Sequence, residues 1–266
     1  MNKAELLKKY AREEDDRVPL AQVLDKLNAM ERSDNVTATV FLTERQQVLT
    51  AQMLTELRCS AYTLFGGYEG AQRRAALFLP EWATEGNIAD YAPFAYIRAV
   101  WSEKTTAQIG HRDFLGALMG AGIRRDTVGD ILPGENSCDL IVLRSVAPYL
   151  MQNLTSAGRA VLSLTEIEPG KLLIPEREVK LIRDTVASLR LDSVVGAGFG
   201  LSREKAAALI RSGRVVLDGL ACEKPDRTLS GGEVISARGF GKFRLMPDSH
   251  MTKKGRVGIT IERYIT

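Results

Sequence analysis

The sequence predicts an α+β fold built from three successive parts, and three observations lead to this prediction. The first part of the chain shows helical spacing of apolar residues, the middle alternates strand-type and helix-type segments, and the last third concentrates positive charge. The 266 residues suffice for two or three compact units. We expect an N-terminal helical module at 1–57, a central domain at 58–168, a linker at 169–186 and a C-terminal domain at 187–266.

Helical spacing defines the N-terminal module. In the segment VPLAQVLDKLNAM, the apolar residues Leu20, Val23, Leu24 and Leu27 recur at intervals that place them on one helix face. The segment TERQ, residues 43–46, fits a capping box and so predicts the start of another helix. The following segment SAYTLFGGYEGAQRRAALFLP has two apolar runs around glycines, which predict a hairpin.

The central domain is predicted to be ferredoxin-like. Its strand-type and helix-type segments are, in order, FAYIRAVW, RDFLGALMGAG, TVGDIL, CDLIVL, VAPYLMQNL and RAVLSLTEI. They give the order βαββαβ, which RNA-recognition domains and many small enzymes share. The segment EPGKLLIPERE then predicts a linker, and the alternating apolar residues of RVGITIERYI predict a strand near the end of the chain.

The segment GHRDFLGALMGAG contains His111, Arg112 and Asp113, the trio that opens the catalytic loop of protein kinases. That loop needs a metal-binding Asn where this chain has Leu118, and the chain lacks the Gly-rich and Asp-Phe-Gly segments of kinases. We therefore place Asp113 in the first turn of a helix, where its charge favours the positive end of the helix dipole. Leu118 and Met119 are expected on the buried face of that helix. His111 and Arg112 remain candidates for a secondary RNA or ribosome contact.

Charge and residue types narrow the range of functions. From Leu189 to Thr266 there are fourteen Lys and Arg against eight Asp and Glu, a net charge of +6, whereas the preceding residues carry −3. The C-terminal third is therefore the candidate polyanion-binding region. Two histidines and three widely spaced cysteines favour neither a metal site nor a Ser-His-Asp triad, so we expect no metal, no cofactor and no catalytic residue. The absence of a long apolar run and of a signal peptide predicts a cytoplasmic protein without membrane contact.

The strongest local pattern is RLDSVVGAGFGLSREKAAALIRSGRVVLDG, residues 190–219. Ser202 is a good helix N-cap, and Gly213 suits the left-handed position at the helix C-terminus. Arginine can grip phosphate oxygens and stack on unpaired bases, as RNA binding requires. Further along, Phe240 lies between two glycines and could present an exposed ring, whereas Phe243 is expected in the core. The candidate RNA-binding residues are Arg190, Ser202, Arg203, Lys205, Arg211, Arg214, Arg238 and Lys242.

This pattern resembles the S4 domain of ribosomal and RNA-modifying proteins. Arg190 and Arg203 match the positions of that family's RNA-binding arginines, and Asp218 stands where the family usually has Asn. Together with FGGYEGAQRRAALFLP and GHRDFLGALMGAGIRRDTVGDIL, most of the chain resembles the YlmH-type S4-domain proteins of bacteria. The resemblance implies a non-catalytic protein that binds rRNA and tRNA on the large (50S) ribosomal subunit. It also implies a role in ribosome-associated quality control of stalled nascent chains, together with other quality-control factors.

Two other functions stay open at this point. One is an RNA-modifying enzyme similar to pseudouridine synthases, because S4 modules accompany such enzymes and the chain contains Arg190-Leu191-Asp192. Against it, this trio opens the S4 pattern, and the chain lacks room for a separate catalytic domain of the usual size. The other is a protein-docking adaptor, because the central strands lack the basic and aromatic signature of an RNA-recognition sheet.

Overall fold

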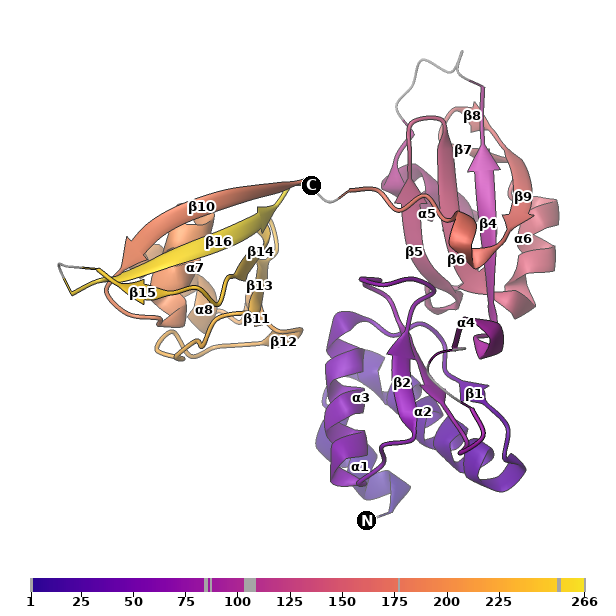
Figure 1. Cartoon of the computed structure of the whole chain (residues 1–266), viewed down its shortest axis with the longest axis horizontal. Coiled ribbons are helices and arrows are strands. Elements are labelled where there is room, and N and C mark those ends of the chain that lie inside the picture. The colour runs from indigo at the N-terminus through magenta and orange to yellow at the C-terminus, as the bar shows by residue number, and fades with distance from the viewer. Residues whose placement is uncertain are drawn as a thin grey trace. The chain divides into compact units, whose positions relative to one another are not determined.

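The computed structural model describes residues 2–83, 86, 88–102, 109–176, 178–252 and 255–265. The chain forms two compact units, unit 1 at Met1–Pro175 and unit 2 at Glu176–Thr266, which we treat separately. Both units contain helices and antiparallel sheets, so the predicted α+β class is confirmed (Figure 1). None of the described helices combines the length and the apolar character that crossing a bilayer requires.

Unit 1 begins with three helices and a small sheet of order β1-β3-β2. The predicted capping box is confirmed, because Thr43 and Gln46 each accept a hydrogen bond from the backbone N–H of the other. The predicted hairpin is also present, as β2 and β3. Strand β1 pairs with β3, so this sheet extends across the domain boundary predicted at residue 57. The elements are α1 (Lys3–Tyr10), α2 (Glu14–Ser33), β1 (Thr37–Ala38), α3 (Glu44–Glu56), β2 (Tyr62–Phe65), β3 (Ala75–Phe78) and α4 (Ile88–Tyr91).

A second sheet, of order β5-β6-β4-β9, forms the centre of unit 1. All its neighbouring strands are antiparallel. The predicted strand and helix segments are found in the predicted order, except that the last one divides into β8 and β9. The elements are β4 (Phe94–Val100), α5 (His111–Gly120), β5 (Val128–Pro133), β6 (Ser137–Leu143), α6 (Ala147–Asn153), β7 (Ser156–Ala157), β8 (Ala160–Val161) and β9 (Ser163–Ile167).

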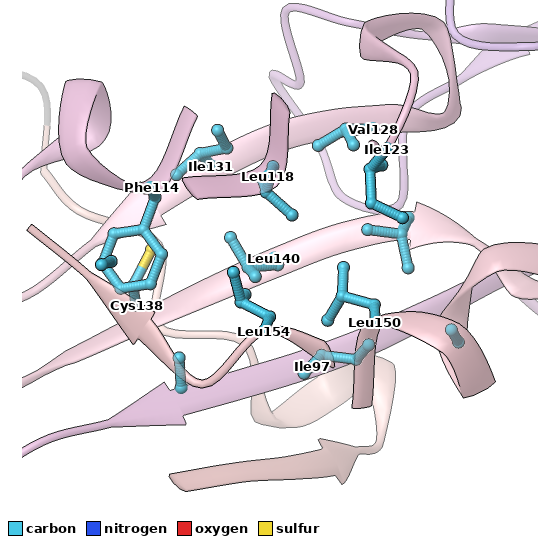
Figure 2. Packing of buried hydrophobic residues seen from close by; sticks show 14 of the residues in the cluster. Ile97, Phe114, Leu118, Ile123, Val128, Ile131, Cys138, Leu140, Leu150 and Leu154 are labelled. Carbon is cyan, nitrogen blue, oxygen red and sulfur yellow. The ribbon is translucent and has the colours of Figure 1, made fainter. Parts of the chain in front are cut away.

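Helices α5 and α6 cover one face of the central sheet. Phe114 and Leu118 from α5 and Leu150 from α6 pack against Leu140 of β6 in one buried cluster (Figure 2). The prediction for Leu118 is confirmed, but Met119 is exposed, because Phe114 lies one turn before Leu118 and fills that face instead.

The N-terminal sheet covers the other face of the central sheet. Phe94 and Tyr96 of β4 and Ile141 of β6 form a buried cluster with Phe41 and with Leu77 of β3. The rings of Phe41 and Phe94 stack with their centroids 4.7 Å apart. Strand β4 therefore buries side chains on both of its faces, and its sequence reads as a nearly continuous apolar run.

A buried ion pair fixes the end of unit 1 to the central sheet. Nε and Nη2 of Arg98 each lie 2.7 Å from a carboxylate oxygen of Asp139, whose side chain is 1% exposed. The same guanidinium donates to the carbonyl of Lys171 at 2.6 Å, and the backbone N–H of Leu173 donates to Asp139 at 2.7 Å. Residues 171–173 are thereby held against β4 and β6.

Unit 2 packs two helices against a sheet of order β10-β16-β14-β13-β11-β12, and β15 pairs with β16. The predicted final strand is confirmed as β16. Residues 179–186, predicted to belong to a linker, instead form β10 and pair with β16 along their whole length. The elements are β10 (Val179–Val186), α7 (Leu191–Phe199), α8 (Arg203–Arg211), β11 (Val215–Leu217), β12 (Leu220–Ala221), β13 (Val234–Ala237), β14 (Gly241–Leu245), β15 (His250–Met251) and β16 (Val257–Tyr264).

Candidate nucleic-acid interface

Helix α8 of unit 2 begins and ends where the sequence predicts. Helix α8 starts after Ser202, whose Oγ accepts a hydrogen bond from the backbone N–H of Lys205 at 3.3 Å. Gly213, just beyond its end, has φ +70°. Helix α7 ends at Gly200, which also has a left-handed conformation. These two ends are favourable for glycine, because other residues pay a steric cost at positive φ.

Asp192, in the first turn of α7, joins Arg190 and Arg203, the two arginines that the S4 resemblance singles out. Nε and Nη2 of Arg190 lie 3.3 and 3.1 Å from the two carboxylate oxygens of Asp192. Nε of Arg203 lies 3.2 Å from Oδ2 of the same residue. Arg190 and Arg203 are thirteen positions apart in the chain, yet one buried carboxylate orients both guanidinium groups.

The carboxylate of Asp192 is held in its charged form. Burial alone would raise its pKa, but hydrogen bonds from Arg190 and from Arg203 outweigh burial, so the pKa lies below its ordinary value. The hydrogen bond from Arg190 to Asp192 raises the pKa of the guanidinium in turn. The cluster of two arginines and one aspartate therefore carries a net charge of +1.

Both guanidinium groups remain accessible to a ligand. The side chain of Arg190 is 38% exposed and that of Arg203 is 58% exposed. Each guanidinium has five N–H donors, and Asp192 takes only two from Arg190 and one from Arg203. The remaining donors can reach phosphate oxygens, and Asp192 limits the conformations that the two side chains would lose on binding.

The other basic candidates lie on α8 and on the adjoining strands. Lys205 and Arg211 are exposed at opposite ends of α8, about 9 Å apart along its axis at 1.5 Å per residue. Arg214 donates to the carbonyl of Arg238 at 3.5 Å, so these two exposed arginines lie side by side. Lys242 is partly buried on β14. The basic residues thus form one group near Asp192 and another near β11 and β13.

Ser202 has the capping role that the sequence predicts, whereas Phe240 differs from its prediction. The hydroxyl oxygen of Ser202 caps α8, and the group keeps its hydrogen and one lone pair for a ligand. The ring of Phe240 is not freely exposed, because its centroid lies 5.7 Å from that of Phe199 and the residue is partly buried. Phe243 is fully buried, as predicted.

The segment 224–228 is a part of the site that the sequence does not indicate. Its backbone carbonyls at Pro225 and Arg227 accept hydrogen bonds from the first N–H groups of α7 at 2.9 and 2.8 Å. The exposed side chains of Lys224 and Arg227 are therefore near the start of α7. Only the basic residues within this short segment could have suggested its role, because the contact joins parts of the chain that are more than thirty positions apart.

The remaining candidates, His111 and Arg112, belong to unit 1. Both are exposed in the first turn of α5. Asp113 accepts a hydrogen bond from the backbone N–H of Gly110 at 3.0 Å, which confirms that it serves the start of the helix. Across the part of the chain that the structure describes, no group of three or more His, Cys, Asp or Glu side chains could hold a metal ion.

Comparisons with known proteins agree with this division of the chain. The family model described as "Putative RNA-binding domain in YlmH" matches residues 95–171, and the S4 domain model matches residues 189–235. Ribosome-associated protein quality control protein P2 of Bacillus subtilis is 33% identical over 249 residues, which cover 94% of this chain and 95% of the relative. The structure of cell division protein ylmH from Streptococcus pneumoniae matches 59% of this chain and 93% of its own, with 19% identity and a TM-score of 0.47.

Proposed function

Because the chain belongs to the YlmH family of S4-domain RNA-binding proteins, we propose that it binds rRNA and tRNA on the large ribosomal subunit. There it acts in quality control of stalled nascent chains, in keeping with the name of its Bacillus subtilis relative. It has no catalytic role: it occupies and stabilises an arrangement of ribosome and tRNA. Its place of action is the bacterial cytoplasm.

The observation that carries this proposal is the pair of accessible arginines that Asp192 orients in unit 2. RNA affinity arises mainly from neutralising phosphate charges, and further exposed basic side chains lie on α8 and next to β11 and β13. An arginine that is already oriented loses less conformational freedom when it binds a phosphate. The S4 unit is therefore the main RNA contact of the protein.

We also infer that the central sheet of unit 1 has the ferredoxin-like topology. The order β5-β6-β4-β9, with antiparallel neighbours, supports this assignment. The element order βαββαβ, apart from the short β7–β8 pair, supports it further. The packing of α5 and α6 on one face of the sheet is also consistent with it.

The test is co-sedimentation of the full chain with isolated large ribosomal subunits at several salt concentrations. Arg203→Ala is the main variant, because Arg190 still pairs with Asp192 and the buried carboxylate keeps a partner. Arg183→Ala is the matched control, since it removes the same charge from an exposed position on β10.

We expect Arg203→Ala to weaken binding and to reduce the magnitude of the salt slope by about one unit, whereas Arg183→Ala leaves both unchanged. Equal binding by the wild type and by both variants would show that Arg203 does not contact the RNA. If instead a modified rRNA nucleoside disappears on deletion of the gene, the protein is an enzyme and the non-catalytic proposal is wrong.

A further inference from the structure

Other parts of unit 1 cover most of both faces of the central sheet. RNA-recognition domains stack unpaired bases on the exposed face of a four-stranded sheet. Here α5 and α6 cover one face, while the N-terminal sheet covers the other and buries Phe94 and Tyr96 of the central strand β4. The edge of this sheet and its helices are therefore the favoured places for an RNA contact within residues 95–171.

At the edge formed by β5, two arginines lie side by side without a carboxylate partner. Nε of Arg73 and Nη1 of Arg125 both donate to the carbonyl oxygen of Val128, at 3.0 and 2.6 Å. Arg73 also donates to the carbonyl of Phe41, and Arg125 to that of Gly129. All these acceptors are neutral, and across the described residues neither arginine forms an ion pair.

The two acidic side chains whose charges act on Arg73 are directed to other partners. Asp126 pairs with Arg124. Asp130 accepts hydrogen bonds from the hydroxyl of Tyr68 at 2.8 Å and from the backbone N–H groups of Gln72 and Arg73 at 2.7 and 3.0 Å. Its carboxylate thus serves the loop before β3. Burial, and next the charge of Arg125, lower the pKa of Arg73 to about 10, with only partial compensation from Asp130 and Asp126. Two adjacent like charges are unfavourable without an anion, and a bound anion would relieve this repulsion.

Helix α5 of the same unit begins with two further basic side chains. His111 is its first residue, and partial burial and then the charge of Arg125 lower the pKa of the imidazole, which places it in the electrostatic field of that arginine. Arg112 follows and is exposed. It lines a surface groove beside α5 together with Asn153, Thr155 and other residues, and Asp113 is the only acidic side chain among the groove's lining residues.

We propose that Arg73, His111, Arg112 and Arg125, the β5-edge cluster, bind phosphate groups of an RNA backbone. Guanidinium forks match phosphate oxygens, and His111 can donate an N–H to the same group. RNA is the ligand because the chain already carries an RNA-binding S4 domain, and because the residues of α5 and β5 lie within the region matched by the YlmH RNA-binding model. The choice of RNA as the ligand rests on the proposed function, whereas the contact itself is separate from the S4 contact.

The experiment measures the affinity of the full chain for protein-free large-subunit rRNA over a range of salt concentrations. His111→Glu places a negative charge in the cluster, and the helix should tolerate it, because Glu is favourable in a first helical turn. Gln152→Glu is the matched control, an exposed position on α6 that makes the same change in net charge. Arg112→Gln is a second test, because that side chain is exposed and can be neutralised without opening the core. Circular dichroism checks that each variant is folded.

We expect His111→Glu and Arg112→Gln each to weaken rRNA binding several-fold and to reduce the magnitude of the salt slope by about one unit, with no such effect from Gln152→Glu. The effects should persist in an Arg203→Ala background, because the S4 contact lies on another unit. If neither variant differs from Gln152→Glu, the β5-edge cluster does not bind RNA, whatever the result for Arg203→Ala. If the variants weaken binding to inorganic polyphosphate but not to rRNA, the cluster binds another anion and the proposal is wrong.

Discussion

The replacement Asp192→Asn tests the cluster at the centre of the S4 unit. It preserves the shape of the side chain but leaves Arg190 and Arg203 without the negative charge that they share. Hydrogen bonds to charged groups contribute about 1.5–3 kcal/mol where they are shielded from water, but exposed ion pairs contribute only about 0.2–1 kcal/mol. Both arginines are more than one third exposed, so the lower range applies to each. For the two arginines together, we expect the free energy of unfolding to fall by about 0.4–2 kcal/mol.

The assay is urea unfolding of the full chain, followed by two signals. Both tryptophans, Trp82 and Trp101, lie in unit 1, so their fluorescence reports unfolding of that unit alone. Circular dichroism reports both units. We expect Asp192→Asn to shift a transition that is visible by circular dichroism and to leave the fluorescence transition in place. The control is Glu223→Gln, which removes an exposed carboxylate from the same unit and should shift neither.

The pH dependence supplies the decisive check. Because the pKa of Asp192 is lowered in the folded protein, its charge stabilises the fold above the ordinary Asp pKa of about 3.9, and this contribution is lost as pH falls through the lowered value. The difference in the free energy of unfolding between wild type and Asp192→Asn should therefore be largest near pH 7 and shrink below about pH 4. A difference that is absent at pH 7, or unchanged at about pH 3, would refute the assigned role of the carboxylate.

Three further substitutions have definite expected effects on stability. Ser202→Ala should lower the free energy of unfolding by about 1 kcal/mol, because it removes the cap of α8, and should leave rRNA affinity unchanged. A loss of rRNA affinity would show instead that the hydroxyl contacts RNA. Gly198→Ala would place Cβ 2.6 Å from Cζ of Phe243, so we expect a loss of about 1–3 kcal/mol by urea unfolding, and a neutral result would contradict this packing. Asp139→Asn should lower the free energy of unfolding by about 3 kcal/mol, because it leaves Arg98 unpaired. The tryptophan fluorescence transition should then occur at a lower urea concentration. An unshifted transition would mean that this ion pair does not stabilise unit 1.

The sequence predicts those elements whose signals are local. Thr43 caps α3, Ser202 caps α8, and the apolar periods of the central strands and helices are strong enough to give their order. The strand β10 was not predicted, because side chains along most of its length are exposed on both faces, so it shows no regular alternation. Its partner β16 lies about eighty positions away, and only that pairing makes the segment a strand.

The candidate site is predictable in composition but not in arrangement. The net positive charge and the S4 pattern identify Arg190 and Arg203 as candidates. That Asp192 binds both arginines depends on how α7 and α8 pack, which no spacing of residues reveals. The pair formed by Arg73 and Arg125 was missed for the same reason, because the contact joins the loop before β3 to the turn before β5.

The buried ion pair of Arg98 and Asp139 sets the length of the connection between the two units. It holds Leu173, and β10 begins at Val179, so the intervening chain can extend by only about 20 Å. When one unit has bound an RNA molecule, such a short tether keeps the other at a high effective concentration near that molecule. The RNA contacts of the two units would then together hold the RNA more strongly than either contact alone. The protein could still dissociate stepwise, with either unit leaving the RNA first.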